Sequence, residues 1–135
     1  MKRFLFGFET VLARATLAGM LALASPALPV RADDMDNGLI RLAEILGAAH
    51  HLREVCGANE GPLWRNKMID MLGAANADAA ERQRLIEHFN NAYYSYRSRY
   101  PVCTPPAAAE ANSLFDEAHR LAARLSGTDI SASAL

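Results

Sequence analysis

Apolar residues recur every three or four positions in four stretches of this chain, and none of these four shows the strict alternation of a half-buried strand. The spacing predicts helices over about residues 37–56, 62–72, 79–100 and 105–125. In the first, the apolar face is formed by Leu39, Leu42, Ile45, Leu46, Ala49, Leu52 and Cys56. Short, turn-rich connections favour antiparallel neighbours. We therefore expect an all-α fold, a small bundle of about four antiparallel helices.

Residues that begin or end helices stand at each of these boundaries. They are Asp36 or Asn37 and Gly57 for the first helix, Pro62 and Gly73 for the second, Asp78, Glu81 and Pro101 for the third, and Thr104, Pro105 and Gly127 for the fourth. Asp78 and Glu81 have the spacing of a capping box, with the aspartate in the cap position.

The first 32 residues are typical of an export signal. Lys2, Arg3 and Arg14 give a positive start, residues 15–24 are apolar, and Ala32 ends a candidate cleavage site. A membrane anchor is the competing interpretation, but the apolar stretch 15–30 contains two prolines and is shorter than the roughly 20 residues of a spanning helix. We expect a cleaved signal peptide at 1–32, a helical domain at 33–127, a flexible tail at 128–135, and a soluble periplasmic product.

Removal of the signal would change the charge balance. The 14 basic and 15 acidic residues of the full chain would become 10 and 14, because four basic residues and Glu9 leave with residues 1–32. A mildly acidic product of 103 residues argues for one domain and against a nucleic-acid partner, which would require a basic surface. No stable membrane insertion is expected after cleavage.

The chain contains two cysteines, Cys56 and Cys103, in neither a CxxC nor a CxxCH pattern. Export and an even count favour a structural disulfide between them. Two buried free thiols are the alternative. On the predicted helices, Cys56 ends the first and Cys103 lies between the third and fourth, so a bond would staple a helix end to a connection.

Five short patterns occur in order along the predicted domain: LAEILG at 42–47, LREVCG at 52–57, LWR at 63–65, FNNAY at 89–93 and CTP at 103–105. Together they resemble an uncharacterised family of small exported bacterial helical proteins, a domain of unknown function. The resemblance extends over most of 38–125 and includes both cysteines. It implies the compartment and the fold, and it brings no catalytic residue and no ligand.

Four residues are candidates for contact with a ligand or a partner. Arg53 lies near the apolar face of the first helix, where it either caps the helix end or pairs with a carboxylate such as Glu60, or else binds an anion. Trp64 is either a core anchor or a stacking platform. Tyr94 points away from the core stripe of the third helix, Arg97 lies nearer the flank of that stripe, and the two form a possible partner patch.

A metal site has little support in the sequence. His50, His51 and Glu54 have helical spacing, but HExxH, paired Glu-x-x-His motifs and a Cys/His cluster are missing, so a solvated polar flank explains them better. No nucleophile motif is present either. We expect no cofactor and a non-enzymatic interaction or accessory protein of the cell envelope. The alternative is a protein that binds a small anion or saccharide near Arg53 and Trp64.

Overall fold

A computed structural model describes residues 32–127, and within this range the fold is entirely helical. The four helices are α1 (Ala32–Val55), α2 (Leu63–Ala74), α3 (Ala79–Arg99) and α4 (Pro105–Leu125). The expected all-α bundle of about four helices is confirmed. The predicted signal peptide, apart from Ala32, and the predicted tail lie outside the described residues.

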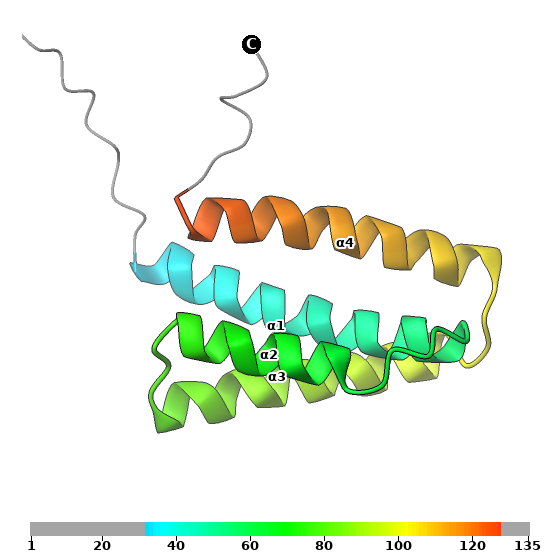
Figure 1. Cartoon of the computed structure of the whole chain (residues 1–135), viewed down its shortest axis with the longest axis horizontal. Helices are drawn as coiled ribbons and strands as arrows, with labels where there is room; N and C mark the ends of the chain where they lie inside the picture. The colour runs from blue at the N-terminus through cyan, green and yellow to red at the C-terminus, as the bar shows by residue number, and fades with distance from the viewer. Residues whose placement is uncertain (1–31, 128–135) are drawn as a thin grey trace, which may run out of the picture.

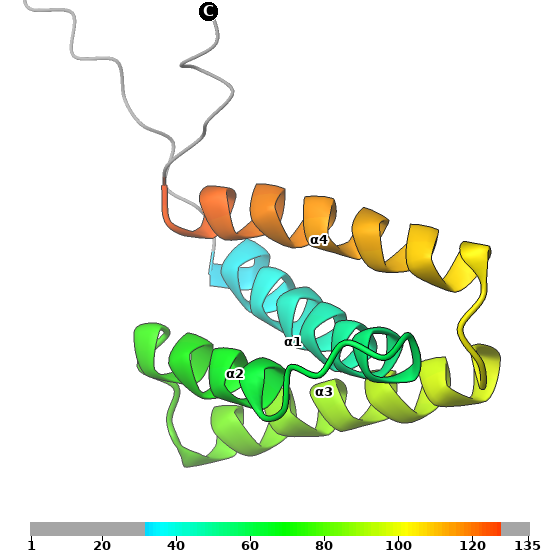
Figure 2. The same cartoon turned by 45° about the vertical axis from the view of Figure 1, so that its right-hand side comes forward.

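Helix α1 is the central element of the bundle. Consecutive helices run antiparallel, so α1 is antiparallel to α2 and α4 and parallel to α3 (Figure 1). Both views place α1 between α4 on one side and the pair of α2 and α3 on the other (Figures 1 and 2). Among the four described helices, the contact between α1 and α3 is the most extensive, followed by that between α1 and α4.

Two apolar clusters meet on α1. One joins α1 to α2 and α3 through Leu39, Ala43, Leu46, Met68, Leu72, Leu85 and Phe89. The other joins α1 to α4 through Ile45, Ala48, Leu52, Ala107, Ala111, Leu114 and Leu121. A single apolar face was expected for this helix, and that expectation is wrong. Small residues such as Ala43 and Gly47 allow neighbouring helices to cover further sides of α1.

The closest approach of two helices is at Gly47. A Cβ atom built on this residue would overlap the backbone carbonyl of Phe89 on α3. Glycine is therefore required here for space, because any side chain would force α1 and α3 apart.

Two predicted boundaries differ from the structure. Helix α1 begins at Ala32, about five residues before the predicted start, because Asp33 and Asp34 are favourable in a first turn and Asp36 pairs with Arg84 of α3, with 2.9 Å between Oδ2 and Nη1. Helix α2 passes through Gly73 and ends at Ala74. The reversal takes place at Asn76, whose φ of 52° lies in the left-handed region that asparagine tolerates.

The caps of α3 and α4 form as the sequence predicts. The side chain of Asp78 accepts a hydrogen bond of 2.9 Å from the backbone N–H of Glu81. Thr104 accepts one of 3.3 Å from the N–H of Ala107, and Pro105 follows in the first turn of α4.

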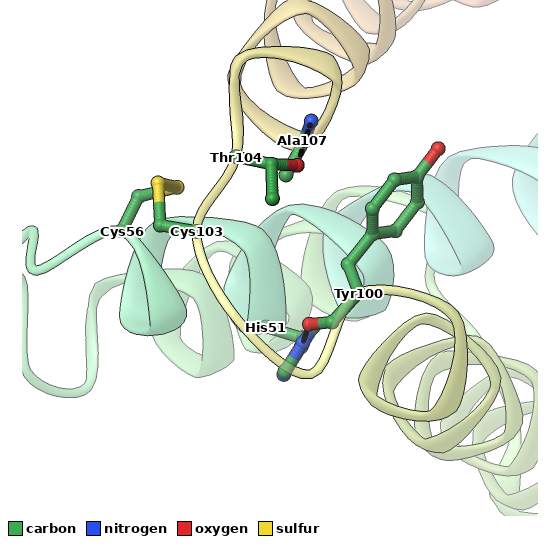
Figure 3. Close-up of a disulfide and its surroundings, with 6 residues drawn as sticks. All are labelled: His51, Cys56, Tyr100, Cys103, Thr104 and Ala107. Carbon is green, nitrogen blue, oxygen red and sulfur yellow. Dashed lines mark hydrogen bonds between the residues drawn. A yellow bond between two sulfur atoms is a disulfide. The ribbon is translucent and has the colours of Figure 1, made fainter.

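The connection between α3 and α4 is attached to the end of α1 by two interactions (Figure 3). Cys56 and Cys103 form a disulfide, as expected, across 47 positions of sequence. One turn earlier on α1, Nε2 of the buried His51 lies 2.8 Å from the carbonyl oxygen of Tyr100, so the ring donates a hydrogen bond there. These two interactions hold the connection against the end of α1 and so fix the point at which α4 begins.

Candidate functional site

Arg53 and Trp64 lie together at the C-terminal end of α1, and Glu60 joins them. Arg53 donates two hydrogen bonds to Glu60, one of them 3.0 Å from Nε to Oε1. The indole N–H of Trp64 donates to the other carboxylate oxygen at 2.7 Å. The Trp64 ring stacks on Phe115 of α4, with 5.3 Å between centroids and 4° between planes. Glu60 thus ties the end of α1 to the first turn of α2.

The charges in this cluster compensate one another. Hydrogen bonds from Arg53 lower the pKa of Glu60 below its ordinary value, and the same bonds raise the pKa of Arg53. The guanidinium also lies 5.9 Å from the centroid of Phe115. Of the roles that the sequence left open for Arg53, pairing with Glu60 is therefore the one that the geometry describes.

A small hollow of about 170 Å³ adjoins this cluster. Its charged and polar lining comprises His50, Arg53, Glu54, Asn59, Glu60 and Trp64. The two carboxylates outweigh the one arginine, and Arg53 is already engaged by Glu60. An anion would meet a net negative surface in this hollow, which makes it a poor anion site.

Tyr94 and Arg97 lie apart from Arg53 and Trp64, and neither lines the hollow. Tyr94 is 62% exposed on α3 and makes an edge contact with Tyr93, whose ring centroid is 5.3 Å away. The hydroxyl of Tyr93 in turn donates to Glu54 at 2.8 Å. The four candidate residues therefore form two separate groups, one at the junction of α1 and α2 and one on the outer surface of α3.

The histidine pair is not a solvated flank, so that interpretation is wrong for His51 and incomplete for His50. His51 is 5% exposed and bonded to Tyr100 as described above. His50 is half-buried, with its ring 5.2 Å from that of Tyr93, and burial lowers its pKa. Within residues 32–127 no group of three or more potential ligands could hold a metal ion.

An apolar groove that could not be read from the sequence lies on the surface of the described bundle. It has a volume of about 610 Å³ and is formed by α1, α2 and α4. All of its lining residues except Asp70 and Ser126 are apolar: Met35, Leu39, Leu42, Met71, Ala74, Ala75, Ala122 and Leu125. We call this feature the apolar groove. Leu42 belongs to the predicted apolar face of the first helix, and the sequence does not reveal that α2 and α4 leave space between them.

Polar side-chain contacts join α4 to α1 and to α3. Arg41 of α1 binds Glu117 of α4 through two hydrogen bonds of 2.7 and 2.8 Å, and Tyr96 of α3 donates to Glu110 of α4 at 2.8 Å. The space between α3 and α4 is thus bridged by side chains, and that between α2 and α4 is closed at one end by the Trp64–Phe115 stack. The apolar groove lies at the other end.

Residues 32–127 define a small all-α protein of four helices, in which a disulfide ties the end of α1 to the connection between α3 and α4. None of the helices described is long and apolar enough to cross a bilayer. The chain belongs to the family described as Protein of unknown function (DUF2385), whose model matches residues 34–128. No curated protein and no solved structure matches the chain.

Proposed function

We propose that this chain is a non-enzymatic interaction or accessory protein of the cell envelope, working in the periplasm, and that it binds an apolar segment of a partner protein in the apolar groove. The observation that carries the proposal is the groove itself. Its volume of about 610 Å³ is in the range of ligand-binding clefts, roughly 300–1,000 Å³. Apolar side chains that line the groove remain accessible to solvent, whereas a closely packed bundle would bury them.

The composition of the groove favours a peptide segment over a small polar molecule. Met35 and Met71 stand on two of its walls, and methionine side chains adapt to different apolar surfaces because they are unbranched and flexible. The wall from Met35 to Leu42 is about 10 Å long at 1.5 Å per helical residue. That length accommodates about two turns of a helix or three residues of an extended chain.

Export is supported by the disulfide between Cys56 and Cys103, since such bonds persist mainly outside the cytoplasm. The charged start and apolar stretch of residues 1–32 support it independently.

In-cell photocrosslinking tests the proposal. A photoreactive phenylalanine analogue at Ala74, an exposed residue of the groove wall, should form a covalent adduct with one envelope protein. The same group at Tyr94, exposed on α3, is the matched control and should not form that adduct. An adduct from Tyr94 and none from Ala74 would place the partner surface on α3 and reject the groove.

The small-ligand alternative rests on the hollow beside Arg53 and Trp64. It is less well supported, because that hollow is about 170 Å³ and its hydrogen-bonding groups already bind one another. Thermal melts with a panel of anions and saccharides test it. A saturable rise in melting temperature that is lost in Arg53→Met would favour this alternative.

A further inference from the structure

We infer that residues 128–135 of this chain occupy the apolar groove while no partner is bound, so that the partner must displace them. The inference rests on the proposed function, because it concerns the regulation of the same groove. Three observations support it: where α4 ends, what sequence follows, and how far that sequence can reach.

Helix α4 ends against the groove. Its last residue, Leu125, and the following Ser126 both line the groove. The N–H of Gly127 then bonds to the carbonyl oxygen of Arg124, and Gly127 has a φ of 71°. A left-handed residue at this position ends the helix and turns the chain away from the helix axis. Residues 128–135 therefore start at the rim of the groove.

The sequence of this segment matches an apolar groove. Ile130, Ala132 and Ala134 alternate with Ser131 and Ser133, so in an extended conformation these three apolar side chains would lie on one side, and the last residue, Leu135, would lie on the other. The one charged residue, Asp129, precedes the alternating stretch.

The segment is also long enough. Eight extended residues span about 26 Å, whereas the wall from Met35 to Leu42 is about 10 Å long. Because the segment is covalently attached at the rim, its effective concentration at the groove is of the order of millimolar. Even a weak intrinsic affinity is then sufficient for occupancy, and an untethered partner of higher affinity can still replace the segment.

The test uses the full helical domain with its tail, labelled with carbon-13 in the methyl groups of isoleucine and methionine. We expect nuclear Overhauser contacts between the Ile130 δ-methyl and the ε-methyls of Met35 and Met71. The methyl of Ile69, which is 60% exposed on α2 outside the groove, provides an internal control and should show no contact with Ile130. Contacts that appear between differently labelled molecules in a mixed sample would indicate a second copy and overturn the inference.

A pair of variants gives a second readout. Ile130→Asp should raise the fluorescence of the apolar-surface dye anilinonaphthalene sulfonate several-fold, because the groove would open. Ser131→Asp adds the same charge one position later, on the opposite side of an extended segment. It should raise the dye fluorescence much less. Equal effects of the two variants, or no effect of either, would contradict the inference.

Crosslinking from Ala74 separates failure of this inference from failure of the proposed function. If both hold, Ile130→Asp increases the yield of the partner adduct. If only the function holds, the adduct forms with the same yield in both variants and the contacts of Ile130 are missing. If only the tail contact holds, the methyl contacts are present and no partner adduct forms in any variant.

Discussion

At the scale of single residues, Arg53 shows how a charge near an apolar face is accommodated. Its aliphatic stem follows the end of α1, and its guanidinium is neutralised by Glu60 seven residues later. Glu60 also holds the indole of Trp64, so one carboxylate orients both of the side chains that the sequence marks as unusual in this region.

Arg53→Met and Glu60→Gln should each lower the free energy of unfolding by about 0.5 to 1 kcal/mol, the range for a partly exposed ion pair. The Trp64–Phe115 stack should persist in both variants. In a double-mutant cycle, the double variant should lose less than the sum of the two single losses, because the variants remove the same interaction. Strict additivity in urea denaturation would show that the pair contributes nothing.

Among the described glycines, Gly47 has the least room for a side chain. Gly47→Ala should lower the free energy of unfolding by about 3 kcal/mol or more, since the added methyl overlaps the Phe89 carbonyl and α1 must separate from α3. Gly73→Ala is the control. It lies within α2 with no atom near the added Cβ, and it should be stabilising by about 0.5 to 1 kcal/mol. Equal unfolding midpoints for the two variants would contradict the close approach of α1 and α3.

At the scale of helices and connections, the link between α3 and α4 is held by the disulfide, by His51 and by the Thr104 cap. These interactions set where α4 begins. The position of α4 in turn determines one wall of the apolar groove, through Ala122 and Leu125.

The double variant Cys56→Ser with Cys103→Ser should lose about 4 kcal/mol of stability, the chain-entropy estimate for a closed loop of 47 residues. Reduction of the wild-type protein should lower its melting temperature to about that of the double variant. A melting temperature that is the same under reducing and non-reducing conditions would mean that the bond adds no stability.

The helix boundaries that were predictable from sequence depend on local signals. Asp78 and Thr104 cap their helices through atoms three residues away, and Pro101 follows the end of α3, so no knowledge of neighbouring helices is needed. The start of α1 was not predictable in this way, because Asp36 is stabilised by Arg84 from another helix.

The candidate site was predictable to a similar degree. Pairing of Arg53 with Glu60 could be anticipated because both residues flank one short connection. The burial of His51 and the existence of the apolar groove could not, since each depends on which helix lies beside α1. A leucine or methionine that lines an open groove has the same helical spacing as one that is fully enclosed.

At the scale of the whole molecule, ion pairs between arginines and carboxylates connect the outer helices to α1. Hydrogen bonds from Arg84, Arg53 and Arg41 lower the pKa values of Asp36, Glu60 and Glu117 respectively. Each carboxylate is charged in the folded state at a pH where it would already be protonated in the unfolded chain.

Stability should therefore decrease at acid pH. A carboxyl group with a lowered folded-state pKa contributes stability that is complete above its unfolded value, 4.5 for a glutamate, and that is lost as the pH falls through the lowered pKa. His50, whose pKa is lowered by burial, adds a smaller loss that begins below 6.5.

Melting temperatures recorded between pH 8 and pH 3 test this dependence of stability on pH. We expect a plateau above pH 7, a shallow decline below 6.5 and a steep one below 4.5. Glu60→Gln with Glu117→Gln should lower the plateau and flatten the acid decline. A melting temperature that stays constant down to pH 3 would contradict the role of these pairs.

The central claim is that the apolar groove is a binding surface. A comparison of two glutamate variants of α4 tests this claim most directly. Ala122→Glu places a charge in the groove at an exposed position of α4, and Ala109→Glu is the same change on an exposed residue of α4 outside the groove. With the photoreactive group at Ala74, the account predicts that Ala122→Glu abolishes the partner adduct, that Ala109→Glu preserves it, and that both variants melt close to the wild-type temperature. An adduct of undiminished yield in Ala122→Glu would contradict the account.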